Sequence, residues 1–173
     1  MSANELQRFF ETWDWESQQT TKVLKSLPEG QYDFRPDPKG RSLGEMAWHL
    51  AEGDAYMTWG IDQNGFGMQT KPPGIERPKT IAELAPGYER IHRDAVARIQ
   101  KLKPEDLDRT IPFFRDEPMP IRTILWSTVI HHGVHHRGQL MLLARQAGGV
   151  VPGVYGPNRE EMLKMMEEMK AKG

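Results

Sequence analysis

The stretch VIHHGVHHRGQL, residues 129–140, holds four of the six histidines of this 173-residue chain. Apolar residues at helical spacing extend on both sides of it and predict one long helix from about Arg122 to Gln146. Residues four apart share a helix face, so the histidines form two pairs: His131 with His135, and His132 with His136. The helix is apolar nearly all the way round. Its periodicity therefore predicts a central place in the fold but does not choose between the two pairs.

Three more helices are predicted before this one, over residues 4–27, 42–60 and 80–103. The second and third of these begin with the spacing of a capping box, Ser42 with Glu45 and Thr80 with Glu83. Residues 62–79 are rich in Gly and Pro and are expected to form a long loop, a kind of segment that is often functional. Alternating apolar residues around a charged turn predict a small hairpin within residues 108–123.

The chain changes character after the fourth long helix. Gly148 and Gly149 are expected to end that helix, and Asn158 to cap a short Met-rich helix that reaches about Lys170. Four long helices with little strand favour an all-α fold, a four-helix bundle over about residues 4–146. A C-terminal loop and short helix, residues 147–173, complete a single domain of 1–173.

Composition excludes several classes of function. The 23 Lys and Arg residues balance 24 Asp and Glu residues without a basic run, so no nucleic-acid partner is expected. No run of 18 apolar residues suggests a membrane span, and the first residues lack the features of a signal peptide, so a cytoplasmic location is expected. The chain has no cysteine, which excludes a disulfide, a cysteine nucleophile and a thiolate ligand for zinc. Any metal ligands must therefore be His, Asp or Glu.

Two histidines one turn apart in an apolar helix can share one metal ion, although histidines in helices often serve only as hydrogen-bonded core or surface residues. The residue after His132 is Gly133, so the HExxH pattern of metalloproteases is absent. A third ligand would complete a typical open metal site. His49, on an otherwise apolar face of the second helix, is the better candidate, whereas His92 lies among charged residues and is expected to be solvated.

The sequence resembles the DinB/YfiT-like family of metal-binding four-helix bundles. The resemblance rests on WHLAEGD in the second helix, on HGVHHRGQL in the fourth and on the later VPGVYGP. The hallmark of the family is HxxxH followed at once by Arg-Gly-Gln, which here ends at Gln139. This resemblance implies one divalent metal ion held by His49, His132 and His136. It resolves the choice between the two pairs, since only His136 directly precedes Arg-Gly-Gln.

The resemblance leaves the reaction open. Similar proteins include thiol-dependent S-transferases, a glutathione- or mycothiol-dependent isomerase and metal-dependent hydrolases, and a fold alone does not fix a reaction. We favour a thiol-dependent S-transferase acting on a small molecule, with a low-molecular-weight thiol as cosubstrate. A hydrolase is the alternative, and a non-catalytic metal- or ligand-binding stress-response protein is a third interpretation. Zinc is the expected metal, and nickel or iron would suit the same nitrogen ligands.

Further residues near the expected site are candidates for supporting roles. Glu52 is a candidate general base, or a hydrogen-bond acceptor for a metal-ligating side chain. The alternative is a solvated helix residue without a role in the site. Tyr56, His135 and Gln139 are candidates for the substrate pocket, and Arg137 is expected to form a structural ion pair. Three tryptophans are expected in the core or in the pocket wall: Trp48, Trp59 and Trp126. An apolar stripe near the C-terminus favours a homodimer or covers the end of the bundle: Met162, Leu163, Met165, Met166 and Met169.

Overall fold

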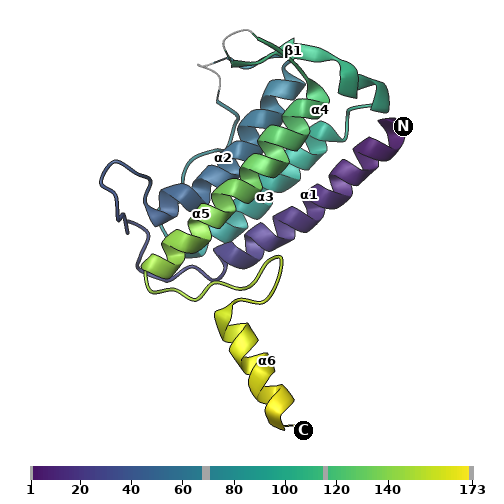
Figure 1. Cartoon of the computed structure of the whole chain (residues 1–173). Helices are drawn as coiled ribbons and strands as arrows, with labels where there is room; N and C mark the ends of the chain where they lie inside the picture. The colour runs from purple at the N-terminus through teal and green to yellow at the C-terminus, as the bar shows by residue number, and fades with distance from the viewer. Residues whose placement is uncertain (1, 68–70, 115–116, 172–173) are drawn as a thin grey trace.

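The structure is a computed structural model, and it describes residues 2–67, 71–114 and 117–171. Four long helical segments lie side by side in it: α1 (Ser2–Leu24), α2 (Leu43–Asp62), α3 (Ile81–Ile99) and α5 (His132–Gln146) (Figure 1). Contacts join α2 to both α3 and α5, and α1 also to α3 and α5, so the four helices close into a bundle. The predicted all-α fold is confirmed. No helix of the described part is long and apolar enough to cross a membrane.

Local sequence signals explain where the helices begin and end. The capping box at the start of α2 forms as predicted: Ser42 accepts from the Glu45 backbone, and the Glu45 carboxylate accepts from the Ser42 backbone. The box predicted for α3 does not form: the Thr80 hydroxyl accepts no backbone N–H and instead donates to the Glu83 carboxylate at 2.7 Å. Gly148 ends α5 with a φ of +83°, a conformation that glycine adopts at little cost.

The chain between α3 and the last long helix carries small elements. A short 3₁₀ helix, η1 (Pro104–Asp108), was not predicted from the sequence. The predicted hairpin is present, and its strands β1 (Thr110–Pro112) and β2 (Pro118–Pro120) pair antiparallel with Ile111 opposite Met119. The hairpin lies at one end of the bundle (Figure 1).

The fourth long helix is continuous but not α-helical throughout. It begins as α4 (Ile121–Thr123), continues as a π-helical segment, η3 (Ile124–His131), and becomes regular in α5 at His132. The sequence predicted a plain α-helix here. A π-helical segment widens the turn and shifts which residues share a face, and such segments often occur next to functional sites.

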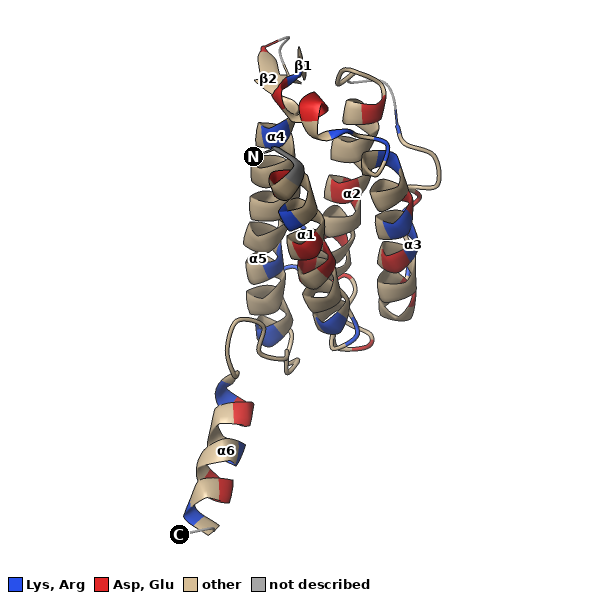
Figure 2. Ribbon diagram, turned by 90° about the vertical axis from the view of Figure 1, so that its right-hand side faces the viewer, with Lys and Arg blue, Asp and Glu red and all other residues tan. Residues whose placement is uncertain are grey.

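The C-terminal helix α6 (Arg159–Ala171) projects away from the bundle (Figures 1 and 2). Asn158 caps it as predicted, since its side-chain oxygen accepts from the Glu161 backbone. No described residue of α6 is buried, and its apolar stripe is exposed. The expectation that this stripe covers the end of the bundle is therefore wrong, because the loop before α6 directs the helix outward.

The core has two apolar clusters with a polar layer between them. One cluster includes Trp48 and is formed by residues of all four long helices. The other includes Phe9, Ile61 and Ile124 and lies near the hairpin. Between the clusters lie most of the buried polar side chains: Ser17, Thr20, Asp54, Thr58 and Arg137. This layer lies at the height of the histidines of α5. The middle of the bundle therefore contains buried polar side chains, and apolar side chains pack on both sides of them.

Candidate metal centre

His49, His132 and His136 come together between α2 and α5. One ligating nitrogen of each lies within 4.8 Å of those of the other two. Their ring centroids are 5.2 Å apart for His49 and His132, 4.5 Å for His49 and His136, and 4.3 Å for His132 and His136. Gly53 lies one turn after His49 beside the cluster, where a Cβ would make an ordinary van der Waals contact of 3.6 Å with Nδ1 of His132.

The donor set fits a divalent metal ion. Burial, together with the neighbouring charges of His136 and His49, lowers the pKa of His132 to about 4. Burial is also the main cause that lowers the pKa of His136. Both imidazoles are therefore neutral at pH 7, which is the form that binds metal. Tetrahedral nitrogens at a zinc ion lie about 3.3 Å apart, so small side-chain rotations would bring the three rings onto one ion.

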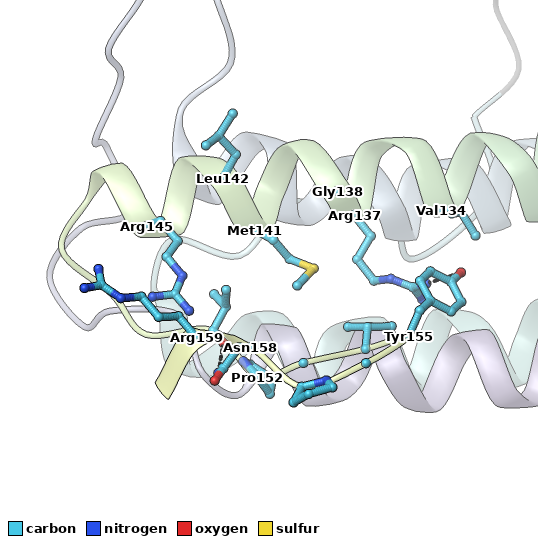
Figure 3. Close-up of a pocket in the computed structure, with 15 residues that line it drawn as sticks. Val134, Arg137, Gly138, Met141, Leu142, Arg145, Pro152, Tyr155, Asn158 and Arg159 are labelled. Atoms are coloured by element: carbon cyan, nitrogen blue, oxygen red, sulfur yellow. Dashed lines mark hydrogen bonds between the residues drawn. The ribbon is translucent and has the colours of Figure 1, made fainter. Parts of the chain in front are cut away.

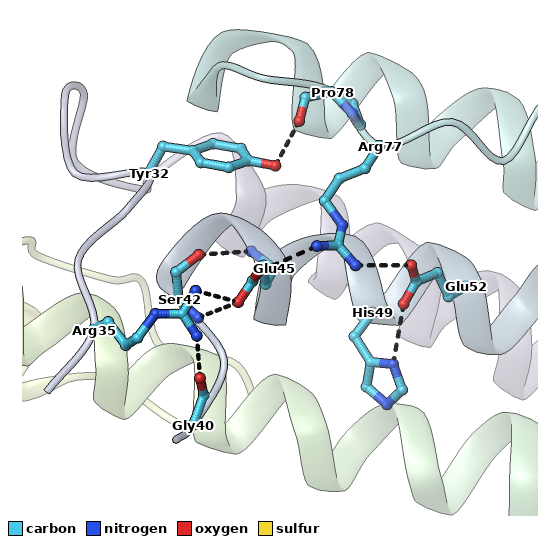
Figure 4. A network of polar contacts seen from close by, with 9 residues as sticks. All are labelled: Tyr32, Arg35, Gly40, Ser42, Glu45, His49, Glu52, Arg77 and Pro78. Atoms are coloured by element: carbon cyan, nitrogen blue, oxygen red, sulfur yellow. Dashed lines mark hydrogen bonds and ion pairs between the residues drawn. The ribbon is translucent and has the colours of Figure 1, made fainter. Parts of the chain in front are cut away.

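A chain of charged side chains orients His49 (Figure 4). Nδ1 of His49 lies 3.4 Å from the Glu52 carboxylate, which also accepts from Arg77 at 3.2 Å. Arg77 reaches Glu45 as well, at 3.4 Å, and Arg35 donates to the same Glu45. Burial acts to raise the pKa of Glu52, but the hydrogen bonds from His49 and Arg77 outweigh it and lower that pKa. Glu52 is thus a carboxylate that holds one nitrogen of His49 and leaves the other facing α5.

His136 has a similar partner on its own helix. Its Nδ1 donates to the side-chain oxygen of Gln139 at 2.7 Å, and the Gln139 amide donates to His135 at 3.1 Å. Gln139 thereby fixes the ring of His136 with Nε2 free. His131 and His135 are both exposed, so neither belongs to the cluster of three.

Arg137 faces the opposite way, toward α1. Only 2% of it is exposed, and it pairs with the carboxylate of Glu16 and donates to the hydroxyls of Thr20 and Tyr155. The structural ion pair predicted for Arg137 is present. It joins α5 to α1 and to the C-terminal loop, and Arg137 directly follows His136 in the sequence.

The prediction for His92 was wrong. Its ring is mostly buried, edge-on to Trp13 at 4.7 Å between centroids, and its Nδ1 lies 2.9 Å from the buried carboxylate of Asp54. Trp13 also donates to Asp54. The charged neighbours of His92 in sequence lie on other faces of α3, so the residues next to it predict a solvated side chain although its own face is packed. The signal that was missed is Asp54 itself, a carboxylate within the apolar stripe of α2.

One large cavity lies away from the three clustered histidines. It encloses about 640 Å³ between α5 and the C-terminal loop (Figure 3). Its α5 residues occupy the face opposite His132 and His136: Val134, Arg137, Gly138, Met141, Leu142 and Arg145. The metal centre is therefore not part of this cavity. Tyr56 lies two turns beyond His49 on α2 and lines a smaller cavity near the hairpin.

Known proteins share the sequence pattern and the helical fold of this chain. A family model described as the DinB family matches residues 1–169. The chain is 32% identical over 162 residues to the uncharacterized protein YrdA of Bacillus subtilis (strain 168), and the match covers 92% of this chain and 93% of that protein.

Two solved structures have the same fold. A DinB-like protein from Bacillus cereus ATCC 10987 is 33% identical, with a TM-score of 0.71, and the match covers 85% of this chain and 95% of that one. A DinB-like protein from Bacillus subtilis, YjoA, is 18% identical, with a TM-score of 0.67, and the match covers 88% of this chain and 99% of that one. With the family model spanning nearly every residue, the chain belongs to the DinB family.

Proposed function

We propose that this protein is a metal-dependent enzyme that joins a low-molecular-weight thiol, through its sulfur, to a small electrophile. The observation that carries the proposal is the convergence of three imidazoles from α2 and α5 on one half-buried point, where burial lowers the pKa of His132 and of His136. Three protein ligands leave a divalent ion at least one open position. A carboxylate-rich cluster would favour calcium or magnesium, whereas three nitrogens favour zinc, and nickel or iron would suit them also.

The metal ion, when bound, supplies the positive charge that keeps a thiol ionised at neutral pH. His49, His132 and His136 hold the ion. Glu52 acts through His49 as a positioning residue, and Gln139 does so through His136.

Cationic side chains near the three histidines suit an anionic thiol. Arg41 is exposed and close enough that its charge helps to lower the pKa of both His132 and His136, after burial and the other histidines. Such a cation attracts a thiol that carries carboxylates. In the reaction, the thiolate sulfur forms a bond to an electrophilic carbon, and the thiol proton goes to solvent. The bond that breaks at this carbon gives its electrons to the leaving group, or, in an epoxide, to the ring oxygen, which stays attached and takes a proton from solvent. A cytoplasmic location belongs to this proposal, because thiols stay reduced there.

The test is a conjugation assay with glutathione, mycothiol and bacillithiol, each with a model electrophile, with and without added zinc. We expect conjugation with at least one thiol, lost after chelation and restored by metal. The variant His132→Ala should be inactive, and His131→Ala, a change at an exposed neighbour, should keep full activity. The absence of metal-dependent conjugation with all three thiols would contradict S-transfer.

Hydrolysis is the second candidate, and the same donor set favours it. Three histidines with an open position also describe sites in which a metal-bound water loses a proton near neutral pH. Ester or amide cleavage that needs metal but no thiol would support this candidate. Metal binding with neither activity would support a non-catalytic binding protein.

We also propose that two copies of the chain pair through α6. The apolar stripe on α6 is exposed at Met162, Leu163, Met165, Met166 and Met169. At 1.5 Å per residue, the 13 residues of α6 span about 20 Å. The apolar groove of Figure 3, from Val134 to Arg145 on α5, has a similar length of about 17 Å by the same rise. A second copy therefore offers a surface of matching length and apolar character.

A further inference from the structure

A cavity of about 390 Å³ lies at the hairpin end of α2, separate from the groove beside the C-terminal loop. Its walls are mostly aromatic and glycine residues: Tyr56, Trp59, Gly60, Gln63, Gly65, Phe66, Gly67, Pro112 and Phe114. Ligand pockets in proteins typically enclose about 300–1,000 Å³ and combine apolar walls with a few polar groups. The polar side-chain groups of these residues are the Tyr56 hydroxyl, the Gln63 amide and the indole N–H of Trp59, so the composition is that of a binding pocket.

The aromatic wall is held in place by specific contacts. The ring of Phe66 lies directly on Gly60, where any Cβ would collide with it. Phe66 also packs against Phe114, at 5.5 Å between centroids. The guanidinium of Arg98 lies 5.5 Å from the centre of the Trp59 ring. Contacts with Gly60 and with Arg98 therefore order the rings of Phe66 and Trp59 in this wall.

Trp59 carries an unsatisfied donor in this wall. Its indole N–H is buried and has no hydrogen-bond acceptor among the described residues. A buried donor without an acceptor costs about 1–3 kcal/mol, and such groups call for an explanation. A small turn of the indole toward an occupant with an acceptor would remove this cost.

The cavity continues the face of α2 that carries the metal centre. Tyr56 is seven residues after His49, which places it on the same helix face and about 10.5 Å farther along the axis. The turn between them holds Glu52, whose charge acts with burial to raise the pKa of Tyr56. Tyr56 is thus a protonated donor at the border between the histidines and the aromatic wall.

We propose that this cavity binds the aromatic group of the electrophile whose reacting carbon lies at the metal centre. The inference rests on the proposed function and adds the class of substrate: a small molecule with one aromatic ring, joined through a short link to its reacting carbon. A dry cavity of about 150 Å³ is already enough for benzene, so this cavity holds a substituted ring. The Tyr56 hydroxyl, at the border, donates to an oxygen near the reacting carbon.

The first test is direct binding, without turnover. Benzyl alcohol is added to ¹⁵N-labelled protein, with and without zinc, and the five tryptophan indole N–H resonances are followed. Trp59→Phe identifies the resonance of Trp59, and Trp15→Phe identifies that of an exposed tryptophan on α1 as a control. We expect a saturable shift of the Trp59 resonance alone, and no shift with methanol. No shift at Trp59, or an equal shift at Trp15, would overturn the proposal.

The second test uses substrate selectivity. Styrene oxide and propylene oxide are electrophiles that differ by an aromatic ring. Phe114→Ala removes an exposed wall residue, so the protein is expected to fold and to keep its metal. It should lower kcat/KM for styrene oxide by about tenfold, the scale for lost apolar contact in a pocket, and leave propylene oxide unchanged. An equal loss for both epoxides would overturn the proposal.

Failure of this inference is distinguishable from failure of the proposed function. A shift of Trp59 by benzyl alcohol in a protein that binds no metal would keep the aromatic pocket and refute the metal-dependent enzyme. Metal-dependent conjugation without a Trp59 shift would keep the enzyme and refute the pocket.

Discussion

Nδ1 of His49 lies 3.4 Å from the carboxylate of Glu52, one turn along α2, and this contact turns the other nitrogen of His49 toward α5 (Figure 4). The two residues belong to one helix, so their spacing is set by the chain itself. The contact therefore needs no metal ion, and under the proposed function it prepares one of the three candidate ligands.

The first prediction concerns this contact. Glu52→Ala removes the acceptor for His49 and should weaken zinc affinity on the order of 10- to 100-fold, the usual effect of losing the partner of a ligating histidine. Competition with a chelator measures the affinity. Glu89→Ala, which removes an exposed partner of Lys25 on α3, is the control and should bind zinc like the wild type. Equal affinity of the two variants would show that Glu52 does not position His49.

The second prediction concerns Arg137. Arg137→Met leaves Glu16, which is 14% exposed, without its buried partner and should lower the free energy of unfolding by about 3–5 kcal/mol. Urea denaturation measures this change. Arg145→Met breaks an exposed pair with Glu160 and should cost less than about 1 kcal/mol. Similar losses in the two variants would contradict the structural role of Arg137.

Part of the fold and of the candidate site could be predicted from the sequence alone. The ends of the helices follow local signals such as Ser42, Asn158 and Gly148, and these were predictable. The three histidines were predictable as a set only through the family motif, because helix periodicity gave two equivalent pairs on a helix that is apolar all round.

Contacts between distant segments were not predictable. Asp54 meets His92 across two helices, and Arg77 reaches Glu52 from a loop, so both depend on how the bundle packs. The π-helical segment before His132 has no local sequence signal, since it consists of ordinary apolar residues such as Ile124 and Val129. These features follow from tertiary packing, which a single sequence does not display.

The third prediction is a pH dependence. In the folded, metal-free protein the pKa of His132 is about 4, below the 6.5 of an unperturbed imidazole, and that of His136 is also lowered. Between these two pH values the unfolded chain binds more protons than the folded one. The free energy of unfolding should therefore fall as the pH decreases from 6.5 toward 4. Urea midpoints of chelator-treated protein measure this, and in His132→Gln the fall should be smaller. If the free energy of unfolding depended on pH in the same way in the wild type and in His132→Gln, the lowered pKa of His132 would be contradicted.

The fourth prediction concerns α6. The double substitution Met165→Lys and Met166→Lys puts two positive charges on the exposed apolar stripe of α6. Light scattering after size exclusion should show a dimer for the wild type and a monomer for the double variant. Circular dichroism should show the same helix content in both proteins, because no described residue of α6 is buried within its own chain. As a control, replacing Lys164 and Lys170 with glutamine should leave the dimer intact. A wild-type monomer, or a dimeric double variant, would refute pairing through α6.

The metal content of purified protein tests the central claim most directly. Elemental analysis of the wild type should find one divalent ion per chain, and the ion should be lost in His49→Ala, His132→Ala and His136→Ala. His131→Ala, a change at an exposed histidine next to the cluster, should retain it. Circular dichroism should show that all four variants remain folded. Unchanged metal content in the first three variants would contradict the assignment of these histidines as ligands.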